Sequence, residues 1–225
     1  MRPVKIDWFR VFAHTAALAP LALLIWDYTQ DLLSVNPIQD ITLRTGRTAL
    51  TLLVLSLACT PANTVFGFRR ALTVRRALGL YAFMYAGLHF LTFVVLDYGL
   101  DLGLIGDTIA EKRYVLIGFA AFLLLLPMAL TSTRGWMKRM GRNWKTLHRF
   151  VYLAGVLAVV HFIWLVKSDI TEPVRFGIVV LVLLGLRIPI VRKTISNARN
   201  RLTGIAGGPR SKRQTLQVSH NSTVE

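Results

Sequence analysis

One stretch of this chain decides its fold: LGLYAFMYAGLHFLTFVVLDY (78–98). It carries no charged residue before Asp97, close to its end, and its single histidine is His89. A bilayer core about 30 Å thick needs about 20 mostly apolar residues to be crossed by a helix. The stretch therefore predicts a membrane-spanning helix that holds an imidazole at membrane depth.

The same apolar character recurs along the 225 residues, of which 54% are hydrophobic. Five further apolar blocks, each bounded by charged residues, lie at 8–26, 48–66, 114–131, 147–166 and 174–191. We expect an all-α polytopic bundle of six transmembrane helices, in a single domain over residues 1–200. Residues 201–225 are basic and polar, and are expected to form a disordered tail, because such a composition cannot bury an apolar core.

The distribution of charge predicts the topology. The segments 27–47, 97–113 and 167–175 hold nine of the 11 acidic residues and only six of the 27 basic ones. Basic residues gather in cytoplasmic connections of membrane proteins, so these three segments are expected outside and both termini in the cytoplasm. The net charge of +16 then reflects topology and contact with anionic lipid rather than nucleic-acid binding, for which no reading motif is present.

Four of the five histidines lie within or beside predicted spans: His14, His89, His148 and His161. The fifth, His220, is in the tail. Ionisable residues at membrane depth are costly and usually functional, and neutral imidazole is a common axial ligand of haem iron. The alternative is a structural histidine that is hydrogen-bonded to a carbonyl. A haem would be of b type, because the only cysteine is Cys59 and no CxxCH attachment motif exists.

The depth of two histidines sharpens this hypothesis. His89 is the twelfth residue of 78–98, and His161 is the fifteenth residue of 147–166. Both spans run from the cytoplasm outward in the expected topology, so both imidazoles lie in the middle-to-outer half of the bilayer. Ala86 and Gly87 leave room beside His89 for a flat macrocycle. The sequence therefore predicts one haem clamped between the third and fifth spans.

A second haem is less well supported by the sequence. His148 lies thirteen residues before His161, which corresponds to about 20 Å along a helix and suits a second redox site at the inner side. That site would need another ligand at the same depth. The matching position of the third span is near Arg75, which cannot ligate iron, and His14 is the only other histidine available. One haem follows from the sequence, and two need an unusual partner for His148.

Four stretches resemble one known family: NPIQDITLRTGRTAL (36–50), RALGLYAFMYAGLHF (76–90), LTSTRGWMKRMGRNWKTLHRFVYL (130–153) and HFIWLVKSDI (161–170). They are similar to the YedZ/MsrQ family, the haem-binding membrane subunit of the periplasmic methionine sulfoxide reductase system. This family belongs to the ferric-reductase-like transmembrane group. The resemblance covers residues 8–193.

The resemblance implies b-type haem bound by His89 and His161, with His148 as a further iron ligand and His14 as another candidate. It implies a partner in the periplasm, a molybdopterin-containing catalytic subunit that repairs oxidised proteins, and a location in the bacterial inner membrane. Electrons would come from the quinone pool or a cytoplasmic flavin reductase, and FMN is a further implied cofactor. Unlike the larger ferric reductases, this chain lacks a second histidine on the third span and a GxGxxG-containing flavin and nicotinamide domain.

The resulting hypothesis is an electron relay without substrate chemistry of its own. Electrons would enter from the cytoplasmic side or from quinol and leave at the outer face, where the acidic loops could orient a partner. One alternative keeps the haem and makes the protein a transmembrane ferric or cupric metalloreductase. Another drops redox chemistry and makes it a small transporter or an assembly factor, although no internal repeat or broken midplane helix supports a transporter.

Overall fold

The computed structural model describes residues 6–166 and 169–206, and these residues form helices and connections without a β-strand. The elements, in chain order, are α1 (Trp8–Thr29), α2 (Pro37–Phe66), α3 (Arg70–Leu91), the π-helix η1 (Thr92–Asp97), α4 (Leu102–Glu111), α5 (Arg113–Leu130), α6 (Arg134–Met140), α7 (Arg142–Leu147), α8 (Phe150–Leu165), α9 (Thr171–Gly185) and α10 (Pro189–Ala206). The predicted all-α fold is confirmed.

Five segments are long and apolar enough to cross a membrane: α1, α2, α3 with η1, α5, and α7 with α8. They match the first five predicted spans. The sixth predicted span, 174–191, is not one straight helix, because α9 and α10 are bent by 75° relative to each other. Proline has no backbone N–H and disfavours helical geometry in the preceding residue, so the break falls just before Pro189. The bent pair brings the number of candidate spans to six.

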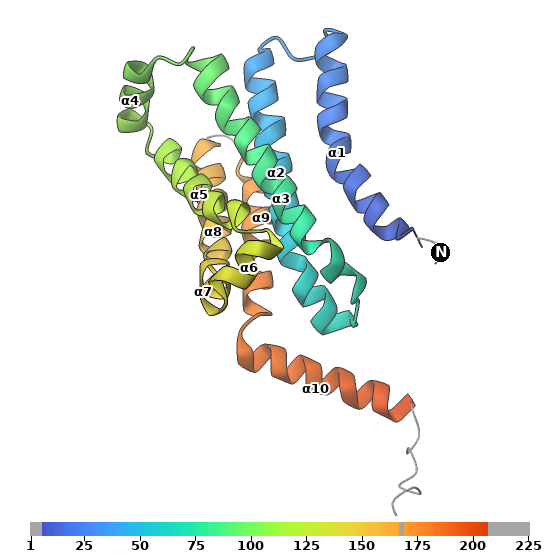
Figure 1. The fold of residues 1–225 in the computed structure, drawn as a ribbon. Helices are drawn as coiled ribbons and strands as arrows, with labels where there is room; N and C mark the ends of the chain where they lie inside the picture. The colour runs from blue at the N-terminus through green and yellow to red at the C-terminus, as the bar shows by residue number, and fades with distance from the viewer. Residues whose placement is uncertain (1–5, 167–168, 207–225) are drawn as a thin grey trace, which may run out of the picture.

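Helix α2 is the centre of the bundle. Half of its most apolar window is buried, against 11–22% in the other four single spans. It packs most extensively against α3, and the second large helix pair is formed by α5 and α8. Figure 1 shows α2 and α3 side by side, with α5, α8 and α9 grouped beside them. These two pairs supply the residues of the candidate site described below.

At two of the prolines inside spanning helices, Pro20 and Pro61, side chains from other helices compensate for the lost hydrogen bonds. Pro20 lies inside α1, which bends along its length (Figure 1). There the Tyr85 hydroxyl donates to the Ala17 carbonyl and accepts from the Leu21 backbone N–H, each at 2.9 Å. The hydroxyl thus bridges the Leu21 N–H and the Ala17 carbonyl, which an unbroken helix would join by a direct hydrogen bond.

The second interruption is at Pro61 in α2. A proline at this position removes the N–H that would bond to the carbonyl of Leu57, four residues earlier. The Nη2 atom of Arg187 donates to that carbonyl at 2.6 Å, and its Nη1 atom donates to the hydroxyl of Tyr152. Arg187 therefore ties the end of α9 to α2 and α8 where the α2 backbone needs a donor.

The connections contain helices that the sequence did not predict. Figure 1 shows α4 at one end of the bundle and α6, α7 and α10 at the other. The α4 end carries the acidic segments, and the α10 end carries the basic ones. Helix α10 continues beyond residue 200 to Ala206, so the boundary drawn between 200 and 201 does not coincide with the end of a helix. Residues 207–225 lie outside the described residues.

Candidate haem site

A cavity of about 440 Å³ lies among α2, α3, α5 and α8 and is lined by both His89 and His161. Small-molecule and cofactor sites measure about 300–1,000 Å³ and are mostly apolar. Most of the other lining residues are apolar or aromatic, and η1 and α4 close part of the cavity. The cavity thus joins the two histidines that the sequence placed at matching depth.

His89 lies in the last turn of α3 and contacts the backbone of α2. Its Nδ1 atom is 2.9 Å from the carbonyl oxygen of Thr42. Because a carbonyl can only accept a hydrogen bond, Nδ1 is protonated and donates. The neutral ring therefore keeps its lone pair on Nε2, which is the nitrogen available to a metal.

His161, on α8, makes the equivalent contact with α5. Its Nδ1 atom donates to the carbonyl of Tyr114 at 2.7 Å, so Nε2 is again the nitrogen with the free lone pair. The ring also packs against the ring of Tyr114, with the ring centres 5.9 Å apart. A ligating histidine commonly donates its other ring N–H to a carbonyl or carboxylate, which fixes the tautomer and the orientation.

The two imidazoles lie next to each other at a spacing that suits one iron. Their ring centres are 6.1 Å apart, and their planes are nearly perpendicular, at 83°. A bond from a first-row metal to an imidazole nitrogen is about 2.0–2.1 Å. Since a ring centre lies about 1.1 Å beyond its nitrogen, an ion between two such rings separates their centres by about 6 Å. The donor set and the spacing fit a bis-imidazole haem.

An aromatic wall borders the cavity between α3 and α5. Phe90 stacks on Phe119 and Phe122, with ring centres 5.6 and 5.1 Å apart, and Phe83 stacks on Phe122 at 5.5 Å. Aromatic side chains offer large flat apolar surfaces. Such a wall is suited to a planar macrocycle and keeps water away from it.

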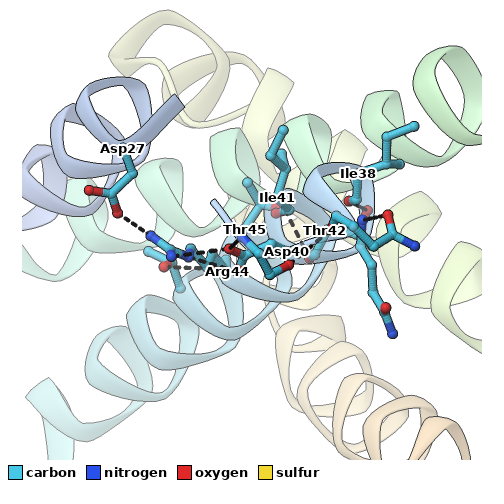
Figure 2. Close-up of polar contacts among 11 residues, drawn as sticks. Asp27, Ile38, Asp40, Ile41, Thr42, Arg44 and Thr45 are labelled. Carbon is cyan, nitrogen blue, oxygen red and sulfur yellow. Dashed lines mark hydrogen bonds and ion pairs between the residues drawn. The ribbon is translucent and has the colours of Figure 1, made fainter. Parts of the chain in front are cut away.

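Ion pairs hold the α4 end of α2, next to the turn that contacts His89. The guanidinium of Arg44 lies between the carboxylates of Asp27 and Asp40 (Figure 2). Its Nε and Nη2 atoms donate to the two Asp40 oxygens at 2.8 and 3.1 Å. One helical turn away, Arg47 pairs with Glu172 of α9 at 2.6 Å. These contacts join the ends of α1, α2 and α9 beside the Thr42 turn.

His148, predicted as a further iron ligand, lies at the other end of the bundle. A turn at residues 148–149 separates α7 from α8. The ring stacks on Trp144 with 3.9 Å between the ring centres, and Nδ1 donates to the Trp144 carbonyl at 3.0 Å. Its Nε2 atom is buried without a hydrogen-bond partner. His148 therefore has the correct tautomer for a ligand, and its role at a second haem stays a prediction.

His14, the other predicted candidate, is exposed on α1. Its Nδ1 atom is 2.9 Å from the Tyr81 hydroxyl, and the two rings meet edge to face. Both contacts are with α3, and no contact recorded among the described residues joins His14 to His148. His220 lies outside the described residues. Among those that are described, no three or more His, Cys, Asp or Glu side chains converge as a metal-binding group.

Sequence reasoning missed the backbone partners of the two histidines. Thr42 and Tyr114 act through their carbonyl oxygens, and no side-chain pattern marks a carbonyl. The only signal was a glycine four residues after each of them, Gly46 and Gly118. Glycine is unfavourable in a helix interior, so its presence there indicates a close approach.

Comparison with known proteins shows the family to which this chain belongs. A family model described as a ferric reductase like transmembrane component matches residues 45–159. A protein of Xanthomonas axonopodis pv. citri, named protein-methionine-sulfoxide reductase heme-binding subunit MsrQ, is 46% identical over 80% of this chain and 85% of its own length. The chain belongs to the MsrQ family.

Further MsrQ relatives cover the same region. The MsrQ protein of Xanthomonas campestris pv. campestris is 45% identical over 83% of this chain and 88% of its own length. That of Rhodospirillum rubrum is 41% identical over 82% of this chain and 89% of its own. Together with the spanning helices, the match confirms the predicted family and identifies this MsrQ-family chain as a multi-pass membrane protein.

Proposed function

We propose that this protein is a membrane electron-transfer subunit that binds haem b between His89 and His161. The observation that carries the proposal is the pair of imidazoles, on different helices, with ring centres 6.1 Å apart across an apolar cavity. The relatives' name, which describes a heme-binding subunit, supports it independently. A haem held by these two imidazoles would accept and release one electron at a time.

The chain's own residues have three tasks in this function. The carbonyls of Thr42 and Tyr114 hold each histidine in the tautomer that presents Nε2. The aromatic wall around Phe90 excludes water. The tight packing of α3 against α2 and of α8 against α5 keeps the two nitrogens at a fixed separation. A preorganised ligand pair lowers the structural change that accompanies each electron transfer.

The electron acceptor is proposed to be a methionine sulfoxide reductase catalytic subunit, as the relatives' name indicates a multi-subunit reductase. We further propose that it is the periplasmic, molybdopterin-containing subunit of this system and that it docks at the α4 end. Asp97, Asp101, Asp107 and Glu111 give that end a negative charge, which can steer and orient a partner. The partnership would serve to repair oxidised periplasmic proteins.

We propose the orientation in the membrane from the distribution of charge. The α10 end carries most basic residues of the described chain, which supports the proposal that it faces the cytoplasm of the bacterial inner membrane. Electrons would then come from quinol in the bilayer or from a flavin reductase at the cytoplasmic face. FMN stays a prediction of the family resemblance, and no described residue is proposed to hold it.

The test is the visible spectrum of the purified protein. We expect a reduced α-band typical of haem b, with haem lost in both His89→Ala and His161→Ala because each variant leaves the iron with one protein ligand. His220→Ala, in the C-terminal segment, serves as the matched control and should keep the wild-type spectrum. A colourless wild-type protein from haem-replete cells would reject the proposal.

A second measurement separates the acceptors. The protein reconstituted with its catalytic partner should reduce methionine sulfoxide in an oxidised protein when quinol or a flavin reductase supplies electrons. If the reduced haem instead passed electrons to ferric or cupric ions and not to the partner, the metalloreductase alternative would replace the partner assignment and leave the haem site intact.

A further inference from the structure

We propose that Gly46 and Gly118 are positioning residues for the two histidines, within one structural device that the chain builds twice. Each copy consists of a backbone carbonyl, a glycine four residues later on the same helix, and a histidine on the packed partner helix. The inference rests on the proposed haem site, and it concerns what fixes the two rings rather than which atoms ligate.

The two copies have the same spacing in sequence. Thr42, Gly46 and His89 form the first, and Tyr114, Gly118 and His161 form the second. In both copies the histidine follows the carbonyl residue by 47 positions. An alanine also follows each glycine by three residues, at positions 49 and 121, and lines the cavity. Two unrelated close approaches would have no reason to share these spacings.

Helix geometry explains why the glycine stands four residues after the carbonyl. A helical carbonyl points along the axis toward the N–H of the residue four positions later. A side chain that donates a second hydrogen bond to that carbonyl must therefore lie over this later residue. The imidazole occupies the space that a β-carbon would fill there, so only glycine leaves the carbonyl accessible to the ring.

The contact distances show how little room exists. A β-carbon at Gly46 would lie 2.9 Å from Nδ1 and 3.1 Å from Cε1 of His89. A β-carbon at Gly118 would lie 2.6 Å from Nδ1 and 2.7 Å from Cε1 of His161. The atoms in the way belong to a ring whose centre lies 6.1 Å from the centre of the opposite histidine ring. The ring therefore cannot retreat without moving the nitrogen that would ligate iron.

Other helical glycines do not share this constraint. The sequence suggested that Gly87, two residues before His89 on α3, leaves room for a macrocycle, but Gly87 is not among the residues that line the cavity. No atom lies within 4 Å of the position of its β-carbon. At Gly79 the nearest atom is Oγ of Ser56 at 3.3 Å, and at Gly155 it is Cδ1 of Leu57 at 3.4 Å. The close approach to a histidine is thus confined to Gly46 and Gly118 among the glycines of the described chain, and Gly87 provides a matched control.

The device has a consequence for the electronic properties of bound haem. An Nδ1–H group that donates to a carbonyl makes the imidazole a stronger donor to a metal through Nε2. Because both Nδ1–H groups donate to a carbonyl, both imidazoles would be strengthened as donors to a bound metal. Because each ring is also fixed in rotation, their nearly perpendicular orientation of 83° is set by the protein and not by the haem.

The experiment compares Gly46→Ala, Gly118→Ala and Gly87→Ala in the full-length protein, by haem content, redox titration and electron paramagnetic resonance of the ferric form. Loss of an outer-shell partner typically lowers metal affinity about 10–100-fold. We expect a haem affinity lowered about 10-fold or more in Gly118→Ala, a smaller loss in Gly46→Ala, and none in Gly87→Ala. Haem that remains should have a raised midpoint potential and an altered resonance, because its ligand has lost the Nδ1–H bond.

A double-mutant cycle separates the effect on the histidines from simple misfolding, because it needs no haem. In the haem-free protein, Gly118→Ala should lower the unfolding temperature when His161 is present and should cost little in a His161→Ala background, where the space is free. Equal effects in the two backgrounds, or haem properties of Gly46→Ala and Gly118→Ala that match those of Gly87→Ala, would overturn the inference. A wild-type protein without haem would instead reject the proposed function. The cycle in the haem-free protein would still test whether the two glycines position the histidines.

Discussion

The two ends of the bundle use histidine differently. Toward the α4 end, His89 and His161 come from different helices, each donates Nδ1–H to a third or fourth helix, and their ring centres are 6.1 Å apart. Toward the α10 end, His148 donates to its own preceding turn and stacks on Trp144. Its buried Nε2 has the same chemistry, but no second imidazole meets it among the described residues.

We infer from this difference that a membrane histidine needs a second histidine beside it, and not depth alone, to form part of the proposed haem site. All three rings are in the tautomer that suits a metal. What distinguishes the first pair is that two helix pairs, α2 with α3 and α5 with α8, converge on one cavity. At the other end, the corresponding position of the bundle is occupied by the arginines of α3 and of the α9 turn, which make structural contacts.

The largest expected effect separates the two ends directly. His161→Ala should abolish haem binding, whereas His148→Ala should keep the haem-to-protein ratio of the wild type, measured by the pyridine haemochrome assay. The reason is that, among the described residues, the ring of His148 is in contact with Trp144 and not with a second imidazole. A halved ratio in His148→Ala would show a second haem at the α10 end, and the histidines of the two ends would then not differ in function.

A smaller effect is expected from Arg187, which serves the backbone at the α10 end. Arg187→Met removes the donor to the Leu57 carbonyl that Pro61 leaves without its helical partner. An unsatisfied buried carbonyl costs about 1–3 kcal/mol, so the free energy of unfolding in detergent should fall by that amount while the haem spectrum is unchanged.

Exposed Arg192→Met is the control for this substitution and should stay within about 0.5 kcal/mol of the wild type. If Arg187→Met kept full stability but altered the spectrum, the arginines of the α10 end would belong to a redox site rather than to the fold.

Tyr85, one turn before His89 on α3, tests whether helix α1 depends on the bundle. Tyr85→Phe removes the hydroxyl that bridges Ala17 and Leu21 at the Pro20 break, and should lower the free energy of unfolding by about 1 kcal/mol. In a Pro20→Ala background the helix can close its own hydrogen bonds, so the same substitution should cost less. Chemical denaturation of the four proteins of this cycle measures the coupling, and additive costs would contradict the bridge.

The smallest effect is expected at the ion pairs beside the Thr42 turn. Arg44→Gln breaks the contacts with Asp27 and Asp40 (Figure 2), whose side chains are partly exposed. Such pairs contribute about 0–1 kcal/mol, and the loss should shrink at high salt because mobile ions screen exposed charges. Lys138→Gln is the control. Loss of haem in Arg44→Gln would show that these ion pairs, and not only the helix packing, hold His89 in position.

Much of this arrangement could be predicted from particular residues. The stretch 78–98 and its counterparts specified spanning helices, because a bilayer core requires a run of about 20 apolar residues whatever the rest of the chain does. The positions of His89 and His161 within their spans predicted a shared level, because helical rise per residue is fixed. The exception was 174–191, where the bend before Pro189 depends on how α9 and α10 pack.

What only the tertiary structure decided is which groups meet across helices. Rise along one helix gives depth but not rotation relative to its neighbours, so the sequence did not show that His89 faces Thr42 and Gly46, or that His161 faces Tyr114 and Gly118. Equally, depth alone left His14 as a possible partner of His148, and packing placed it against Tyr81 instead. The sequence determined the spans, the family and the level of the two imidazoles. Helix packing determined the tautomers, the 6.1 Å separation of the ring centres and the need for glycine behind each ring. These features depend on distances between residues that are far apart in sequence.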